Sequence, residues 1–167
     1  FSEEFSEDFH QTVQRAKEAG VSHIFMPNID DTSVNELLKA CSEFPGYCFP
    51  MLGFHPTSVD NFSMEKVKKM KCLLSGEHPY VGIGEVGIDL YWDKTYRKEQ
   101  KVVLDTQLHW ASELKLPVIL HCREGLDTII EVFDECSGCH PAFPTANFGP
   151  AAQCSCLAPH LCFKLLH

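Results

Sequence analysis

Two stretches decide the fold: Tyr80-Val-Gly-Ile-Gly-Glu-Val-Gly-Ile-Asp89 and Leu116-Pro-Val-Ile-Leu-His-Cys-Arg123. Each contains an apolar run, and a helical pattern over residues 96–114 lies between them, so the sequence predicts a strand–helix–strand unit. Parallel strands joined in this way end on the same face of a sheet. We therefore expect Glu85 and His121, which end the two apolar runs, to converge and to form part of a metal site.

The same alternation of helical and strand patterns extends over residues 1–135. Further apolar strands are predicted over residues 23–29 and 47–54, and Ser33 and Ser63 are predicted to cap the helices that follow them. Strands that are apolar on both faces are typical of a parallel sheet covered by helices. The predicted fold class is therefore α/β, with parallel strand–helix repeats that make up half of an eight-unit barrel or most of a small open sheet.

Residues 136–167 differ in composition from the rest of the chain. None of the 23 acidic residues lies there, whereas five of the nine cysteines and four of the ten prolines do. We expect a boundary near residue 135, followed by a cysteine- and proline-rich tail that is unstructured and poorly packed. Cys136-Ser-Gly-Cys139 has the spacing of half a zinc site, but no second pair follows at the standard spacing, so a zinc site is disfavoured.

Composition and charge limit the classes of function. The net charge of −9 argues against a protein that coats nucleic acid with a broad basic surface, but not against an enzyme that holds phosphates through bound cations. No apolar run is long enough to cross a bilayer, so no membrane passage is expected. Four cysteines, Cys41, Cys48, Cys72 and Cys122, fall in or beside apolar segments, which is typical of buried free thiols and indicates a reducing, cytoplasmic compartment.

Two further side chains belong to the candidate site. His55 follows an apolar strand in Gly53-Phe-His-Pro56, and the proline biases it toward an extended backbone, which holds the imidazole at the strand mouth. Arg123 lies two residues beyond His121 on the same side of its strand, where its guanidinium could bind a phosphate oxygen or pair with a carboxylate.

Each residue also has a structural interpretation. A glutamate at a strand end is often only solvated, and a lone histidine is more often bonded to backbone. The coincidence of three ligand-type side chains at three strand ends favours the metal interpretation. Asp89 is expected mainly to cap the turn that follows it.

Three segments, Gly84-Glu-Val-Gly-Ile-Asp89, Gly53-Phe-His-Pro56 and Leu120-His-Cys-Arg123, together resemble the signature segments of the TatD family of metal-dependent hydrolases. The resemblance covers about residues 1–135. It implies a TIM-barrel-like fold with the site at the C-terminal ends of the strands, divalent cations (Mg2+, Mn2+ or Zn2+), and deoxyribonuclease activity, commonly exonucleolytic. By position it makes Glu85 and His121 the metal ligands.

The resemblance further implies DNA as the substrate and metal-activated water as the nucleophile, with Glu85, His55 and Arg123 as the catalytic residues. The family's opening His-x-His strand and its later aspartate-bearing strand have no counterpart in the sequence. The chain is therefore expected to be a fragment, roughly half a barrel, with little or no activity. Two alternatives stay open: a hydrolase of another phosphoester or ester, and a truncated, non-catalytic binding protein. The sequence does not indicate an oligomeric state.

Overall fold

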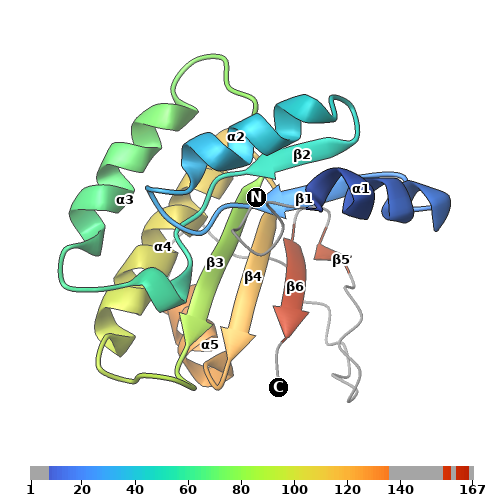
Figure 1. The fold of residues 1–167 in the computed structure, drawn as a ribbon. Coiled ribbons are helices and arrows are strands. Elements are labelled where there is room, and N and C mark those ends of the chain that lie inside the picture. Colours follow the sequence, from blue (N-terminus) through green and yellow to red (C-terminus); the bar gives the residue numbers. More distant parts are fainter. Residues whose placement is uncertain (1–7, 136–155, 159–160, 166–167) are drawn as a thin grey trace.

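Helices and parallel strands alternate along the chain in the computed structural model, which describes residues 8–135, 156–158 and 161–165 (Figure 1). The helices are α1 (Phe9–Glu18), α2 (Val34–Glu43), α3 (Ser63–Lys71), α4 (Arg97–Leu114) and α5 (Leu126–Glu135), with short 3-10 turns η2 (Pro56–Ser58) and η3 (Cys72–Leu74). The strands are β1 (Ile24–Pro27), β2 (Cys48–Met51), β3 (Ile83–Asp89), β4 (Val118–Arg123), β5 (Cys156–Ala158) and β6 (Leu161–Leu165). The predicted α/β class is confirmed.

The strands form two groups that are joined edge to edge, and all the pairs except β5 with β6 are parallel. β1 pairs with β2, β3 pairs with β4, and a bridge between Leu52 and Ile83 connects the two groups. β6 pairs in parallel with β4, and β5 pairs antiparallel with β6. The tail was expected to be unstructured, so these two strands differ from the prediction. Cys136 and Cys139 lie outside the described residues.

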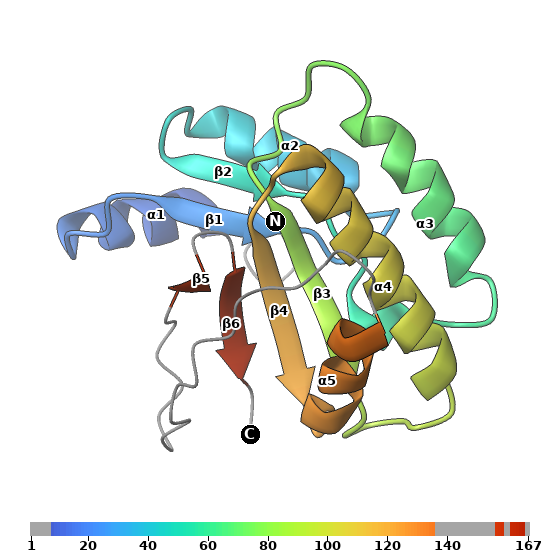
Figure 2. The same ribbon diagram turned by 180° about the vertical axis from the view of Figure 1, so that it is seen from behind.

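The alternation of side chains along β3 and β4 gives the sheet two different faces. One face carries buried apolar side chains that belong to the same core as α4 and α5, namely Val86, Ile88, Leu120 and Cys122. Figure 2 shows these helices in front of the strands, and Figure 1 shows the opposite face without a covering helix. The candidate residues of both strands, at odd-numbered positions, lie on that opposite face.

Glu85 lies within a strand and not at its end, which corrects the sequence prediction. β3 continues for four more residues, and Gly87, Ile88 and Asp89 pair in register with His121, Cys122 and Arg123. Glycines in and beside this strand allow neighbouring backbones to pack closely. A Cβ atom on Gly87 would lie 1.9 Å from the carbonyl oxygen of His121, and one on Gly53 would lie 2.5 Å from the carbonyl carbon of Gly84.

The two serine caps predicted from the sequence are wrong in detail. The hydroxyl of Ser33 accepts from the backbone of Ile29 and Asp30 and donates to Asn28, so it braces the loop before α2 and makes no bond to the helix. Ser63 is the first residue of α3, and its hydroxyl bonds to Asp60. Both serines therefore stabilise loops at the C-terminal ends of the strands.

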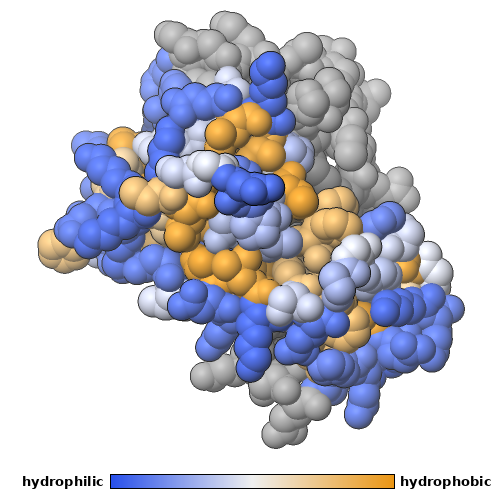
Figure 3. Space-filling view, turned by 90° about the horizontal axis from the view of Figure 1, so that it is seen from above, coloured by the Kyte–Doolittle hydropathy of each residue, from blue (hydrophilic) through white to orange (hydrophobic). Residues whose placement is uncertain are grey.

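Some apolar side chains remain at the surface. The face seen in Figure 3 has apolar patches bordered by hydrophilic residues.

Cys41, Cys48 and Cys122 are buried free thiols as expected, but Cys72 is exposed. None of the helices described here combines the length and apolar character needed to cross a membrane.

Candidate metal centre

His55, Glu85 and His121 meet on the uncovered face of the sheet. Each offers one nitrogen or oxygen ligand atom, and these atoms all lie within 4.8 Å of one another. The Nε2 atom of His55 is 3.2 Å from Nδ1 of His121, which is 3.1 Å from Oε1 of Glu85. The predicted convergence of the two strand positions is therefore confirmed, and His55 joins them in the same cluster.

The backbone around His55 is held by a buried glutamine. Gln107 of α4 accepts a hydrogen bond from the Phe54 N–H at 2.7 Å and donates to the Phe54 carbonyl at 3.3 Å. His55 caps the N-terminus of the turn η2, and its Nδ1 lies 3.2 Å from the backbone nitrogen and 2.7 Å from the hydroxyl of Thr57. If Nδ1 accepts from that N–H, Nε2 carries a proton. If Nδ1 donates to the hydroxyl, Nε2 carries a lone pair that can accept a metal ion or a water proton.

His121 is oriented by a second carboxylate behind it. Its Nε2 lies 2.9 Å from Oδ2 of Asp89, and both residues are buried, with 3% and 4% of their surface exposed. A proton on Nε2 donated to Asp89 leaves the Nδ1 lone pair directed at Glu85, whose exposed fraction is 7%. The Glu85 carboxylate and the Nδ1 lone pair of His121 then face each other in a buried place. A cation that both atoms bind, or a proton on Nδ1, holds them together.

Asp89 is itself held in position from α4. Gln100 accepts from the Asp89 N–H at 2.9 Å and donates to the Asp89 carbonyl at 3.0 Å. The other carboxylate oxygen, Oδ1, accepts from the N–H of Tyr91 at 3.1 Å, which is the turn cap that the sequence predicted. Asp89 therefore caps the turn and also orients His121, as a carboxylate commonly does behind a metal-binding histidine.

The donor set fits a divalent cation. Two imidazoles and one carboxylate are a familiar catalytic set, in which the remaining coordination positions are left to water or substrate. Cys122 next to His121 is not part of this set, because its side chain faces the core and burial raises the pKa of its thiol. The residues of the cluster could hold one ion without a rearrangement of the strands.

Arg123 lies at the same rim of the sheet but makes a different contact. Its guanidinium carbon is 3.7 Å from the centre of the Tyr91 ring and 5.1 Å from that of Trp92. Among the described residues no carboxylate pairs with it, and its buried Nε has no hydrogen-bond partner. The sequence suggested either a phosphate oxygen or a carboxylate as the partner of Arg123. No carboxylate partner is found in the described part of the chain.

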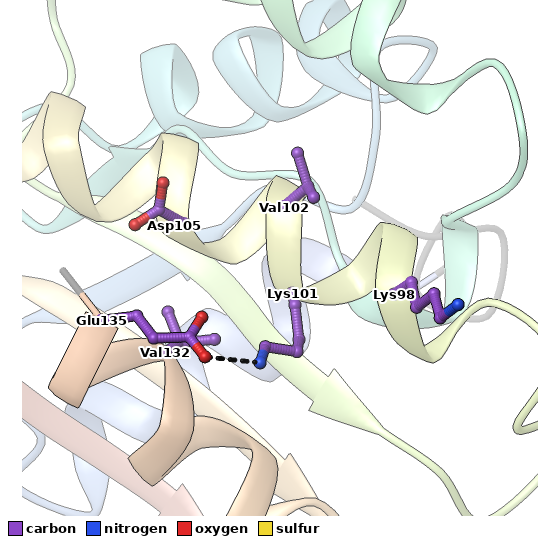
Figure 4. Close-up of a pocket in the computed structure, with 6 residues that line it drawn as sticks. All are labelled: Lys98, Lys101, Val102, Asp105, Val132 and Glu135. Carbon is purple, nitrogen blue, oxygen red and sulfur yellow. Dashed lines mark hydrogen bonds and ion pairs between the residues drawn. The ribbon is translucent and has the colours of Figure 1, made fainter.

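A separate pocket of about 330 Å³ lies between α4 and α5, on the helical side of the sheet (Figure 4). It is lined by Lys98, Lys101, Val102, Asp105, Val132 and Glu135. Lys101 is paired with Glu131 at 3.1 Å and with Glu135 at 3.4 Å, so the local charges largely offset one another. It contains none of the residues of the metal cluster.

Sequence reasoning missed the roles of Gln100 and Gln107. Both are buried, and they are seven residues apart on the inner face of α4. Two amides on the apolar stripe of a helix are a detectable signal, because buried amide groups need hydrogen-bond partners. Their partners could not be identified without the structure.

A parallel sheet with ligand-type side chains gathered at the C-terminal side of its strands is the site arrangement of α/β-barrel metal-dependent hydrolases. The family model described as TatD related DNase matches residues 1–143, and the chain belongs to this family. The family resemblance seen in the sequence is confirmed.

Relatives of known name support the same family. The 3'-5' ssDNA/RNA exonuclease TatD of Yersinia pseudotuberculosis is 35% identical over 131 residues, covering 78% of this chain and 50% of that protein. The uncharacterized metal-dependent hydrolase YabD of Bacillus subtilis is 28% identical over 134 residues, covering 80% and 52%. The chain spans about half the length of the curated relatives it matches.

Solved structures agree on the fold. The TatD homolog YJJV from Escherichia coli k12 superimposes with a TM-score of 0.68 at 29% identity, covering 87% of this chain and 57% of that one. An uncharacterized amidohydrolase from Saccharomyces cerevisiae, at 19% identity and a TM-score of 0.59, shares the fold. The TIM-barrel-like class is thus confirmed, with part of the sheet present here.

Proposed function

We propose that this chain carries the metal centre of a nuclease that hydrolyses phosphodiester bonds in nucleic acid with metal-activated water. The observation that supports it most directly is the buried cluster of His55, Glu85 and His121, with Asp89 behind His121. Membership of the TatD family, and relatives named as exonucleases acting on single-stranded DNA and RNA, support a nucleic-acid substrate. Single-stranded DNA or RNA is therefore the proposed substrate, which is broader than DNA alone.

The donor set favours some metal ions over others. Imidazole nitrogen suits Zn2+ and other transition ions, whereas Mg2+ prefers a shell of oxygen ligands. We expect His121 Nδ1 and the Glu85 carboxylate to hold the ion, with His55 as the third ligand or as a contact to water. Zn2+ or Mn2+ should therefore bind more tightly than Mg2+.

When bound, a divalent ion lowers the pKa of a coordinated water and polarises the phosphate. The side chains of this chain bind the attacking water and the phosphate. Glu85 accepts a proton or hydrogen bond from the attacking water, and His55 Nε2 lies near enough to His121 Nδ1, at 3.2 Å, to contact the same water. Arg123 neutralises charge that develops on the phosphate oxygens.

The expected turnover of this chain is low, because the family resemblance implies more metal ligands than the cluster of the described residues supplies. We retain the proposed boundary near residue 135, with residues 136–167 as a tail whose strands β5 and β6 extend the sheet. The buried thiols of Cys41, Cys48 and Cys122 favour a reducing compartment, and we propose the cytoplasm.

The test is a substrate panel with metal-depleted protein to which Zn2+, Mn2+ or Mg2+ is returned. The panel contains single-stranded DNA, RNA and duplex DNA labelled at either end, and a simple carboxylic ester. Release of nucleotides from single strands, abolished by Glu85→Gln and retained by Glu36→Gln, is the expected result. Glu36 is a suitable control, because it is an exposed glutamate in the first turn of α2. Cleavage of the ester with nucleic acid left intact would contradict the proposal, and so would nuclease activity that Glu85→Gln retains.

A further inference from the structure

Two large aromatic side chains are exposed directly after β3, next to the metal cluster. Tyr91 and Trp92 have 48% and 73% of their surface exposed. Their rings meet edge to face, with centroids 4.7 Å apart and an angle of 88° between the planes. Because the Tyr91 ring braces the Trp92 ring at this angle, the exposed indole of Trp92 offers one ring face on which a planar ligand can stack.

Arg123 gives this aromatic pair a positive charge. Its guanidinium packs over the Tyr91 ring at 3.7 Å, and no carboxylate among the described residues neutralises it. The chain has a net charge of −9, yet Arg123 has no acidic partner within the described ranges. A guanidinium packed over a ring can still donate from its terminal NH2 groups to a phosphate.

The strand positions of Arg123 and Tyr91 relate the aromatic pair to the metal cluster. Arg123 follows His121 by two residues and lies on the same face of β4, so their backbones are about 6 to 7 Å apart along the strand. Asp89, which orients His121, is in register with Arg123 and accepts a hydrogen bond from the N–H of Tyr91. The aromatic pair and the metal cluster are thus tied to the same two strands.

We propose that Tyr91, Trp92 and Arg123 form a nucleotide subsite for single-stranded nucleic acid beside the metal centre. The exposed face of Trp92 stacks on an unpaired base, and the guanidinium of Arg123, supported by the Tyr91 ring, binds a phosphate of the same strand. A base in a duplex already stacks on its neighbours, so the subsite selects unpaired strands. This inference rests on the proposed nuclease function but can be tested without hydrolysis.

The first experiment measures binding of a short oligothymidylate by the whole chain in EDTA, with tryptophan fluorescence as the signal. Trp92 is 73% exposed and Trp110, the other tryptophan, is 2% exposed, so a stacked base quenches mainly Trp92. For the variants, binding is followed by anisotropy of a labelled oligonucleotide. Trp92→Ala should weaken binding by about 5- to 150-fold, and Trp92→Phe should restore most of it, because stacking needs an aromatic ring.

Matched controls separate stacking from charge and from damage to the fold. Leu73→Ala removes an exposed apolar side chain near the opposite ends of the strands and should leave binding unchanged. An abasic oligomer keeps the phosphates but lacks the bases, so Trp92→Ala should not affect its binding. Arg123→Gln should weaken both ligands and should reduce the slope of log affinity against log salt by about 0.7.

The outcomes distinguish this inference from the proposed function. Equal affinity of the wild type and Trp92→Ala for oligothymidylate overturns the subsite, even if the wild type hydrolyses DNA with added metal. A loss of affinity that is as large for the abasic oligomer as for oligothymidylate overturns the stacking role. Binding that depends on Trp92 without any hydrolysis supports the subsite and contradicts the proposed function.

Discussion

Replacement of Asp89 by asparagine should weaken metal binding while the fold is retained. The carboxylate accepts from Nε2 of His121 at 2.9 Å in a place where both residues are almost fully buried. Asparagine keeps the size of the side chain and an oxygen for the Tyr91 N–H, but it can turn its NH2 group toward His121. Nε2 would then become the acceptor, and the proton would move to Nδ1, where it blocks the metal ion.

The magnitude follows from the role of such partners. Loss of the group that orients a metal-binding histidine costs about 10- to 100-fold in affinity, which is about 1.4 to 2.7 kcal/mol. The assay is isothermal titration of the metal-free chain with Mn2+ and with Zn2+. Unfolding by urea, followed in parallel, reports whether the change in affinity comes from damage to the fold.

Asp93→Asn is the matched control. Asp93 lies in the same loop, and its side chain accepts from the N–H of Thr95 at 2.8 Å as part of a similar turn, but it is exposed and does not contact His121. It should bind metal as the wild type does. If Asp89→Asn binds both ions as tightly as Asp93→Asn, the assignment of Asp89 as the residue that orients His121 is refuted.

Three further predictions concern the fold and the site. Gln107→Leu should lower the free energy of unfolding by about 1 to 3 kcal/mol, because the Phe54 N–H loses its buried partner. Gln14→Leu, on the exposed face of α1, should change this free energy little. Urea titration measures both variants, and equal values contradict a stabilising role of the hydrogen bonds between Gln107 and the Phe54 backbone. Burial raises the pKa of Cys41 to about 11, so near pH 8 about one Cys41 thiol in a thousand is ionised. Alkylation should therefore modify exposed Cys72 before Cys41. The reverse order, mapped by mass spectrometry, contradicts the burial of Cys41. Zn2+ should displace Mg2+ from the cluster in competition dialysis, and preference for Mg2+ would contradict a nitrogen-rich site.

The part of the fold that was predictable from the sequence is the part that depends on local patterns. The apolar strands before Glu85 and His121, with an amphipathic helix between them, fixed the parallel pairing and hence the convergence of the two side chains. The strand end at Glu85 was predicted wrongly. β3 continues to Asp89, and Gly87 allows the close approach of the His121 backbone.

Contacts that depend on tertiary packing could not be predicted in the same way. The roles of Gln100 and Gln107 depend on which strand ends their amides reach, and Asp89 contacts His121 only because β3 continues past Glu85. His55 was expected as a catalytic residue at a strand mouth, and its place 3.2 Å from His121 follows from the packing of β2 against β3. The pairing of β6 with β4 had no signal in the composition of the tail.

Anomalous scattering from crystals of the metal-loaded chain tests the metal centre most directly. With Mn2+ or Zn2+ bound, the account predicts a peak about 2.0 to 2.2 Å from Nδ1 of His121 and from a carboxylate oxygen of Glu85. The peak should disappear in Glu85→Gln. A peak at another group of side chains, or no peak at saturating metal, would contradict the assignment of this cluster.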